Sequence, residues 1–322
     1  MDIVMQLAIG VLSIIITLVA NAAACLTTRQ APPQQQAAAQ TVTPAEGVEY
    51  GSFQSASLGK ELKFAIQLPP SYKTDTKRRY PVLYFLHGNN GNEVEFQRRG
   101  VAAAVNRLRE AGKIGEMIIV APAGENSFYL NSKNGVMYED AIIKDLIPHI
   151  EKTYRALGTR EGRAIQGISM GGWGALMLAF RHPEMFSSAS AHSAALYDKL
   201  PVPDGQDRYS MFLDRVIKRL FGDPPDEAFF QANNPLRLAE TNAAAIKKSG
   251  LKIYFDVGAE DRYRYQGTNK LLDERLTKAG IAHEYHQFPG GHGWDYMLSV
   301  MENSYGFLWK NLKTEAGTAQ RR

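Results

Sequence analysis

The chain has 322 residues, of which 44% are hydrophobic and 22% are charged. This composition is that of a globular domain, and it excludes a wholly disordered or fibrous chain. The formal net charge of +4 is small for this length, and no run of basic residues interleaved with aromatics is present, so we expect no nucleic-acid partner. The single cysteine excludes an internal disulfide and a cysteine-based metal cluster.

Residues 1–25 have the pattern of an export leader. The segment 7–20 is strongly apolar, and three alanines at 22–24 follow it directly before Cys25. Small residues after an apolar segment are typical of a signal-peptide cleavage site. A cysteine at that position resembles the bacterial lipoprotein signal, in which the cysteine is lipidated and becomes the mature N-terminus.

Three interpretations of this leader stay open. Cys25 carries a lipid anchor, or the leader is cleaved without lipidation, or it stays as an uncleaved membrane anchor, since the apolar segment is just long enough to span a bilayer. All three predict export, which places the protein in the periplasm, in the outer membrane as a lipoprotein, or outside the cell. The first of them also predicts attachment to a membrane.

The next segment, 26–49, is rich in Gln, Ala and Pro and shows no apolar periodicity. Such a segment cannot bury enough surface to offset the entropy lost on ordering, so we predict a disordered tether. The folded domain is expected over 50–313, and the last residues, 314–322, are expected to form a disordered tail.

From residue 50 on, short apolar segments alternate with segments of helical periodicity. Strands are predicted at 61–68, 82–86, 117–120, 164–166, 187–191, 252–257 and 283–288. Helices are predicted at 101–111, 140–154, 173–181, 267–279 and 295–310. The first strand alternates, as an edge strand does, and the middle ones are uniformly apolar, as buried parallel strands are. This order predicts an α/β fold with a mostly parallel twisted sheet of about eight strands and helices on both faces.

The segment 197–240 interrupts this alternation. It is rich in loops and in prolines, and it follows the strand predicted at 187–191. We therefore expect a loop and helix insertion over the carboxyl edge of the sheet, where α/β proteins form their ligand sites.

The pentapeptide Gly167-Ile168-Ser169-Met170-Gly171 lies between a predicted strand and a predicted helix. A G-x-S-x-G motif in that context forms a strained turn that lifts the serine hydroxyl into the open, and the flanking glycines avoid clashes there. The motif predicts Ser169 as a nucleophile.

A serine hydroxyl needs a base to take its proton. His149 and His182 fall in predicted helices, and His283 and His286 lie on opposite faces of a predicted strand, where they make a poor metal pair. His292 lies in the glycine-rich loop PGGHGWDY after the last strand. We predict His292 as the base and no metal site.

The base needs a carboxylate that holds its tautomer. Glu260 and Asp261 follow the strand that ends near residue 258, whereas Asp256 lies inside that strand. We favour Asp261, and the chain order Ser169, Asp261, His292 is that of the α/β-hydrolases.

Acyl transfer also needs donors for the oxyanion of the tetrahedral intermediate. The backbone amide of Met170, which follows the nucleophile, is one predicted donor. The amide of Asn89, in the loop after the strand VLYFL, is the other. His87 is expected to brace this loop.

The chain resembles the esterase D or putative esterase family on motifs that follow in this order: LHGNNGNE, YEDAIIKDLIPHIEKTY, RAIQGISMGGWGALMLAF, DVGAEDRYRYQGTNKLLDERL and PGGHGWDYM. The family includes S-formylglutathione hydrolases, tributyrin and other short-chain acyl esterases, feruloyl and acetylxylan esterases, and mycolyltransferases. The resemblance implies nucleophile, acid and base at Ser169, Asp261 and His292, and no metal or organic cofactor.

We expect a serine carboxylic ester hydrolase that works through an acyl-enzyme on short-chain acyl, acetyl or feruloyl esters, either small molecules or esters linked to polysaccharide. An acyltransferase of the mycolyltransferase type is an alternative, because transfer and hydrolysis share the same acyl-enzyme. A non-catalytic binding module on the same fold is a second alternative.

Bulky residues near Ser169 predict a confined pocket. Tyr129, Trp173 and His192 are candidates for its lining. Aromatic residues of the insertion are candidates for the opposite wall, or they only pack the insertion onto the domain: Tyr197, Tyr209, Phe212, Phe229 and Phe230. A confined pocket favours short acyl groups, because a long chain would overfill it.

Overall fold

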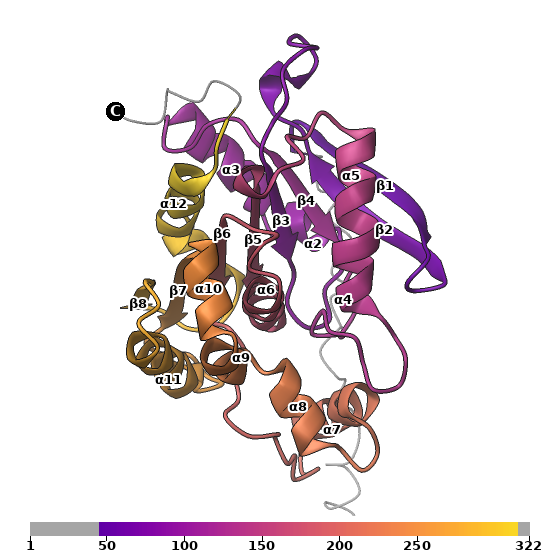
Figure 1. Ribbon diagram of the computed structural model, residues 1–322, viewed down its shortest axis with the longest axis vertical. Helices are drawn as coiled ribbons and strands as arrows, with labels where there is room; N and C mark the ends of the chain where they lie inside the picture. Colours follow the sequence, from indigo (N-terminus) through magenta and orange to yellow (C-terminus); the bar gives the residue numbers. More distant parts are fainter. Residues whose placement is uncertain (1–44, 315–322) are drawn as a thin grey trace, which may run out of the picture. The chain divides into compact units, whose positions relative to one another are not determined.

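The computed structural model describes residues 45–314 (Figure 1). The predictions for the leader, for Cys25, for most of the tether and for 315–322 lie outside the described residues. Among residues 45–314, no helix is both long and apolar enough to cross a membrane.

The core is an eight-stranded sheet with the strand order β1-β2-β4-β3-β5-β6-β7-β8. The strands are β1 Val48–Ser55, β2 Lys60–Gln67, β3 Val82–Leu86, β4 Ile118–Pro122, β5 Arg163–Ile168, β6 Ser188–His192, β7 Lys252–Gly258 and β8 Glu284–Phe288. The pairs β1–β2 and β2–β4 are antiparallel, and every other neighbouring pair is parallel. The predicted fold class, a mostly parallel sheet of about eight strands, is confirmed.

The outer strand β1 differs from the sequence prediction. β1 pairs along the whole length of β2, so β1 and not β2 occupies the edge. Most β1 side chains are exposed or half-buried, and the strand therefore lacks the apolar run that marks the inner strands. β1 begins at Val48, so the folded domain starts before the predicted boundary at Tyr50.

Helices cover both faces of the sheet (Figure 1). They are α2 Glu95–Arg98, α3 Val101–Glu110, α4 Tyr138–Asp140, α5 Ile147–Thr153, α6 Met170–Arg181, α7 Arg208–Phe221, α8 Glu227–Asn233, α9 Pro235–Thr241, α10 Ala243–Ser249, α11 Tyr265–Lys278 and α12 Trp294–Asn311. One cluster of buried side chains lies under α2, α3 and α12, and a larger one lies under α5, α6, α11 and the insertion. The helix predicted at 140–154 is α4 and α5 joined by a π-helical segment, Ala141–Leu146.

The carboxyl ends of the parallel strands position the site. The loops after β3, β5, β7 and β8 meet at this edge of the sheet, as ligand-binding loops do in α/β proteins. The segment after β6 is the predicted insertion, and it consists mainly of α7, α8 and α9. Asp207 caps α7 by accepting a hydrogen bond from the Ser210 amide at 2.7 Å, and Figure 1 shows α7 and α8 together at one end of the sheet.

Candidate active site

Ser169 lies between β5 and α6 with φ 57° and ψ −117°. A non-glycine residue in this region of backbone space is strained, and such strain persists only where the surroundings hold it. Three backbone hydrogen bonds do so: the Ser169 amide donates to the His192 carbonyl at 2.9 Å, and the Ser169 carbonyl accepts from the amides of Trp173 and Ala195, each at 3.0 Å. The turn is the one that the G-x-S-x-G motif predicts.

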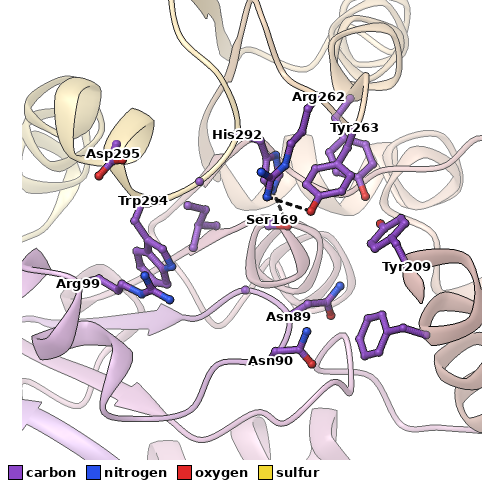
Figure 2. A pocket seen from close by; sticks show the side chains of 15 residues that line it. Asn89, Asn90, Arg99, Ser169, Tyr209, Arg262, Tyr263, His292, Trp294 and Asp295 are labelled. Atoms are coloured by element: carbon purple, nitrogen blue, oxygen red, sulfur yellow. Dashed lines mark hydrogen bonds between the residues drawn. The ribbon is translucent and has the colours of Figure 1, made fainter. Parts of the chain in front are cut away.

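The imidazole of His292 links Ser169 to a carboxylate. His292 Nε2 lies 3.0 Å from Ser169 Oγ (Figure 2), and His292 Nδ1 lies 2.8 Å from Asp261 Oδ2. A carboxylate accepts, so Nδ1 carries the proton and Nε2 is free to accept from the serine hydroxyl. The second carboxylate oxygen of Asp261 accepts from the Tyr263 amide at 2.8 Å, which holds the carboxylate in place. The structure therefore brings together the three residues that the sequence predicts.

The other two candidate carboxylates have different partners. Glu260 accepts a hydrogen bond from the Gly290 amide and so ties the loop after β7 to the loop that carries His292. Asp256 is fully buried in β7 and accepts from the hydroxyl of Tyr296 at 2.9 Å. Of the three carboxylates, only Asp261 contacts His292.

A second Ser-His-Asp arrangement lies inside the protein. His192 Nδ1 is 3.0 Å from Asp256 Oδ1, and His192 Nε2 is 2.9 Å from Ser304 Oγ. All three residues have no exposed surface, and they join β6, β7 and α12. With no path for a substrate, this arrangement satisfies buried polar groups and fastens α12 to the sheet.

Three predicted pocket residues are enclosed instead. The prediction for His192 is wrong, because β6 is covered on both faces and its imidazole is committed to the buried network. Tyr129 is also fully buried, and its hydroxyl donates to the His87 carbonyl at 3.2 Å. Trp173 is 1% exposed and lines a separate apolar cavity of about 10 Å³ under the insertion, together with Tyr197 and Phe230.

The cavity that opens on Ser169 has a volume of about 420 Å³. Its lining comes from the loops at the sheet edge and from α7: Gly88, Asn89, Asn90, Arg99, Ile168, Ser169, Tyr209, Phe212, Arg262, Tyr263, Tyr265, His292, Gly293, Trp294 and Asp295. The insertion thus contributes the wall residues Tyr209 and Phe212, as predicted, whereas its other predicted aromatic residues do not line this cavity. Figure 2 shows these side chains around Ser169.

The two residues whose amides the sequence predicts as oxyanion donors, Met170 and Asn89, lie on segments that meet at Ser169. α6 begins at Met170, so no preceding turn of the helix supplies an acceptor for the Met170 amide. The loop after β3 lies directly against Ser169, because a Cβ added to Gly88 would be 3.4 Å from the Ser169 Cβ. Asn89, the next residue, lines the cavity.

His87 braces this loop, as the sequence predicts. The Gly124 amide donates to His87 Nε2 at 2.8 Å, so the proton is on Nδ1, which donates to the Gly88 carbonyl at 2.7 Å. Burial lowers the pKa of His87 to about 4, and the imidazole is neutral at physiological pH.

Comparison with known proteins agrees with this architecture. Residues 55–302 match the family described as putative esterase. The chain belongs to the putative esterase family. An esterase of Mycobacterium tuberculosis is 33% identical over 258 residues, which are 76% of this chain and 55% of that protein, so the chain spans about half the length of this relative. An acetyl esterase of Caldicellulosiruptor saccharolyticus is 28% identical over 232 residues, 71% of this chain and 83% of that protein.

Solved structures of two other proteins superpose on this member of the putative esterase family. A ferulic acid esterase superposes with a TM-score of 0.68 at 28% identity, covering 82% of this chain and 98% of the other. An S-formylglutathione hydrolase of Agrobacterium tumefaciens superposes with a TM-score of 0.66 at 20% identity, covering 84% and 98%, and shares the fold.

We predict that His87 makes the stability of this protein depend on pH. The folded pKa of about 4 lies below the value of about 6.5 in an unfolded chain, so the unfolded state binds the extra proton first. This contribution to the free energy of unfolding is complete above about pH 6.5 and falls by about 3 kcal/mol as the pH drops to about 4. Urea unfolding of the wild type and of His87→Gln at about pH 7 and about pH 4.5 measures it. The same pH dependence in both proteins would contradict the assignment.

Proposed function

We propose that this chain is a serine carboxylic ester hydrolase with Ser169 as nucleophile, His292 as base and Asp261 as the acid that orients the base. One observation carries the proposal: the continuous hydrogen-bonded series from Asp261 through His292 to Ser169 ends at a cavity, in a chain of the putative esterase family. A binding module has no need for a strained serine whose hydroxyl lies 3.0 Å from an imidazole nitrogen.

The mechanism follows from the positions of the protons. His292 Nε2 takes the hydroxyl proton of Ser169 while Oγ attacks the ester carbonyl carbon, and Asp261 stabilises the imidazolium that forms. The oxyanion accepts from the amides of Met170 and Asn89. When the tetrahedral intermediate collapses, His292 returns the proton to the leaving alcohol. Water then attacks the acyl-enzyme by the same steps and releases the acid.

The lining of the cavity favours small or aromatic acyl groups. Asn89, Asn90 and Arg99 place polar side chains around it, so a long alkyl chain finds little apolar surface to bury. The rings of Tyr209 and Phe212, which line the cavity from α7, supply faces on which an aromatic acyl group stacks. We therefore propose short-chain acyl, acetyl or feruloyl esters as substrates. Relatives described as an acetyl esterase and a ferulic acid esterase support this class.

Replacing Ser169 by alanine tests the nucleophile. Ser169→Ala is expected to lower kcat for p-nitrophenyl acetate by about 10³-fold or more while the protein stays folded, because no other group forms the acyl-enzyme. Ser52→Ala, which changes an exposed serine on β1, is the control and should keep kcat within about threefold. Circular dichroism of both variants checks that they are folded. Retained activity in Ser169→Ala would refute the proposal.

Acyl-chain length tests the substrate class. For a series of p-nitrophenyl esters we expect kcat/KM to be highest from acetyl to butyryl and to fall beyond about eight carbons, because the polar cavity does not stabilise a longer chain. A kcat/KM that rises steadily up to lauroyl esters would show that the site accepts long chains.

A further inference from the structure

Arg262 brings a guanidinium to the cavity that forms no ion pair with the carboxylates of the described residues. Arg262 follows Asp261 in the loop after β7, is exposed and lines the cavity. Within residues 45–314 it takes part in no ion pair, and its side chain donates only to the hydroxyl of Tyr263, at 3.1 Å from Nη2. The guanidinium carbon lies 4.9 Å from the centre of the Tyr263 ring, so the aromatic face holds the cation in place.

Apart from Arg262 and His292, the ionisable side chains of the lining that carry a charge are Arg99 and Asp295, and they lie elsewhere in the cavity. Arg99 is paired with the buried carboxylate of Glu95 at 2.7 Å, and Asp295 is the one carboxylate among the lining residues. Figure 2 shows Arg99 and Asp295 with Trp294 on one side of Ser169, and Arg262 with Tyr263 on the side of His292. On the His292 side the Asp261 carboxylate is buried against His292 and the Tyr263 amide, so the charge that lines the cavity there is the Arg262 guanidinium.

The mechanism indicates which part of the substrate lies next to the Arg262 guanidinium. His292 Nε2 gives its proton to the leaving oxygen, so the alcohol part of the ester must lie on the side of His292. The Tyr263 ring packs edge-on against the His292 ring, with centroids 4.7 Å apart, and the Arg262 guanidinium lies against Tyr263. The oxyanion donors Met170 and Asn89 are on other loops, after β5 and β3. Arg262 thus borders the alcohol part and not the oxyanion.

We propose that Arg262 forms a subsite for a carboxylate carried by the alcohol part of the ester, so that the preferred substrates are acylated hydroxy acids or acylated acidic sugars. The proposal rests on the function proposed above and adds a specificity that the reaction itself does not need. A guanidinium presents two parallel N–H donors that match a carboxylate, and a single unpaired arginine suits a single negative charge. Tyr263 fixes the orientation of the Arg262 guanidinium, because its hydroxyl accepts a hydrogen bond from Nη2 and its ring lies against the guanidinium carbon.

A matched pair of acetate esters tests the subsite. The anionic members are 3- and 4-acetoxybenzoate, and the neutral members are their methyl esters, which have the same shape around the scissile bond. The readout is the ratio of kcat/KM for the anionic ester to that for the neutral ester within each variant, so that changes in folding or in the triad cancel. Because an exposed charge-assisted pair is partly screened by solvent, we expect Arg262→Gln to lower this ratio by about tenfold.

Two further variants sharpen the test. Arg262→Lys keeps the positive charge but lacks the two parallel N–H donors. Its ratio of kcat/KM values should therefore lie between those of Arg262→Gln and the wild type. Arg264→Gln removes an equal charge two positions away, from an exposed side chain outside the cavity lining, and should leave the ratio unchanged. Raising the salt concentration should lower the ratio in the wild type and not in Arg262→Gln.

The outcomes separate this proposal from the esterase assignment. If the wild type hydrolyses both esters through Ser169 but Arg262→Gln leaves the ratio unchanged, the subsite is wrong and the esterase stands. An equal fall for both esters in Arg262→Gln would likewise overturn the subsite, since it would show a role in positioning Tyr263 and His292 only. Hydrolysis of both esters at the wild-type rate by Ser169→Ala would overturn the proposed function itself.

Discussion

The strained turn at Ser169 is the constraint on which the rest of the site depends. A positive φ at a non-glycine residue costs about 1–3 kcal/mol, and it is held here by hydrogen bonds from both sides of the turn. The turn also needs close packing: a Cβ on Gly171 would overlap the carbonyl oxygen of Leu86, and one on Gly167 would overlap the carbonyl of Gly171. Glycine at these positions lets α6 begin directly against the end of β3. The same close approach brings the loop that carries Asn89 against the Ser169 turn, so the proposed nucleophile and both proposed oxyanion donors depend on one backbone feature.

Access to solvent, and not the hydrogen-bond pattern, separates the two Ser-His-Asp arrangements. Ser169 borders a cavity of about 420 Å³, whereas Ser304 and His192 have no exposed surface. The buried network nevertheless supports the site, because it fastens α12 to β6 and β7, and α12 begins two residues after His292. Glu260 adds a second tie by accepting from the Gly290 amide. The position of His292, the proposed base, thus depends on polar groups that lie outside the cavity.

The parts of the fold and site that follow short-range rules were predictable from the sequence. Buried strands, the glycine-flanked turn at Ser169 and the loop positions of Asp261 and His292 are local patterns, and all three residues meet as expected. The outer strand β1 was not predictable from its own composition. It is a strand because it pairs with β2, and that pairing leaves no pattern in the residues of β1. The enclosure of His192, Tyr129 and Trp173 depends on which elements cover them. Whether Arg262 finds an ion-pair partner depends on which carboxylates the fold brings near it. A sequence carries no direct signal for either property.

Phosphonylation by a fluorophosphonate ester tests most directly that chemistry occurs at the open arrangement. The reagent reacts with a serine only where a base removes its proton and an oxyanion site receives the phosphoryl oxygen. Peptide mass spectrometry of the inactivated protein is expected to place one phosphonyl group on Ser169, with Ser304 unmodified and ester hydrolysis lost in proportion to labelling. Labelling of Ser304, or full hydrolytic activity after complete labelling of Ser169, would contradict the account.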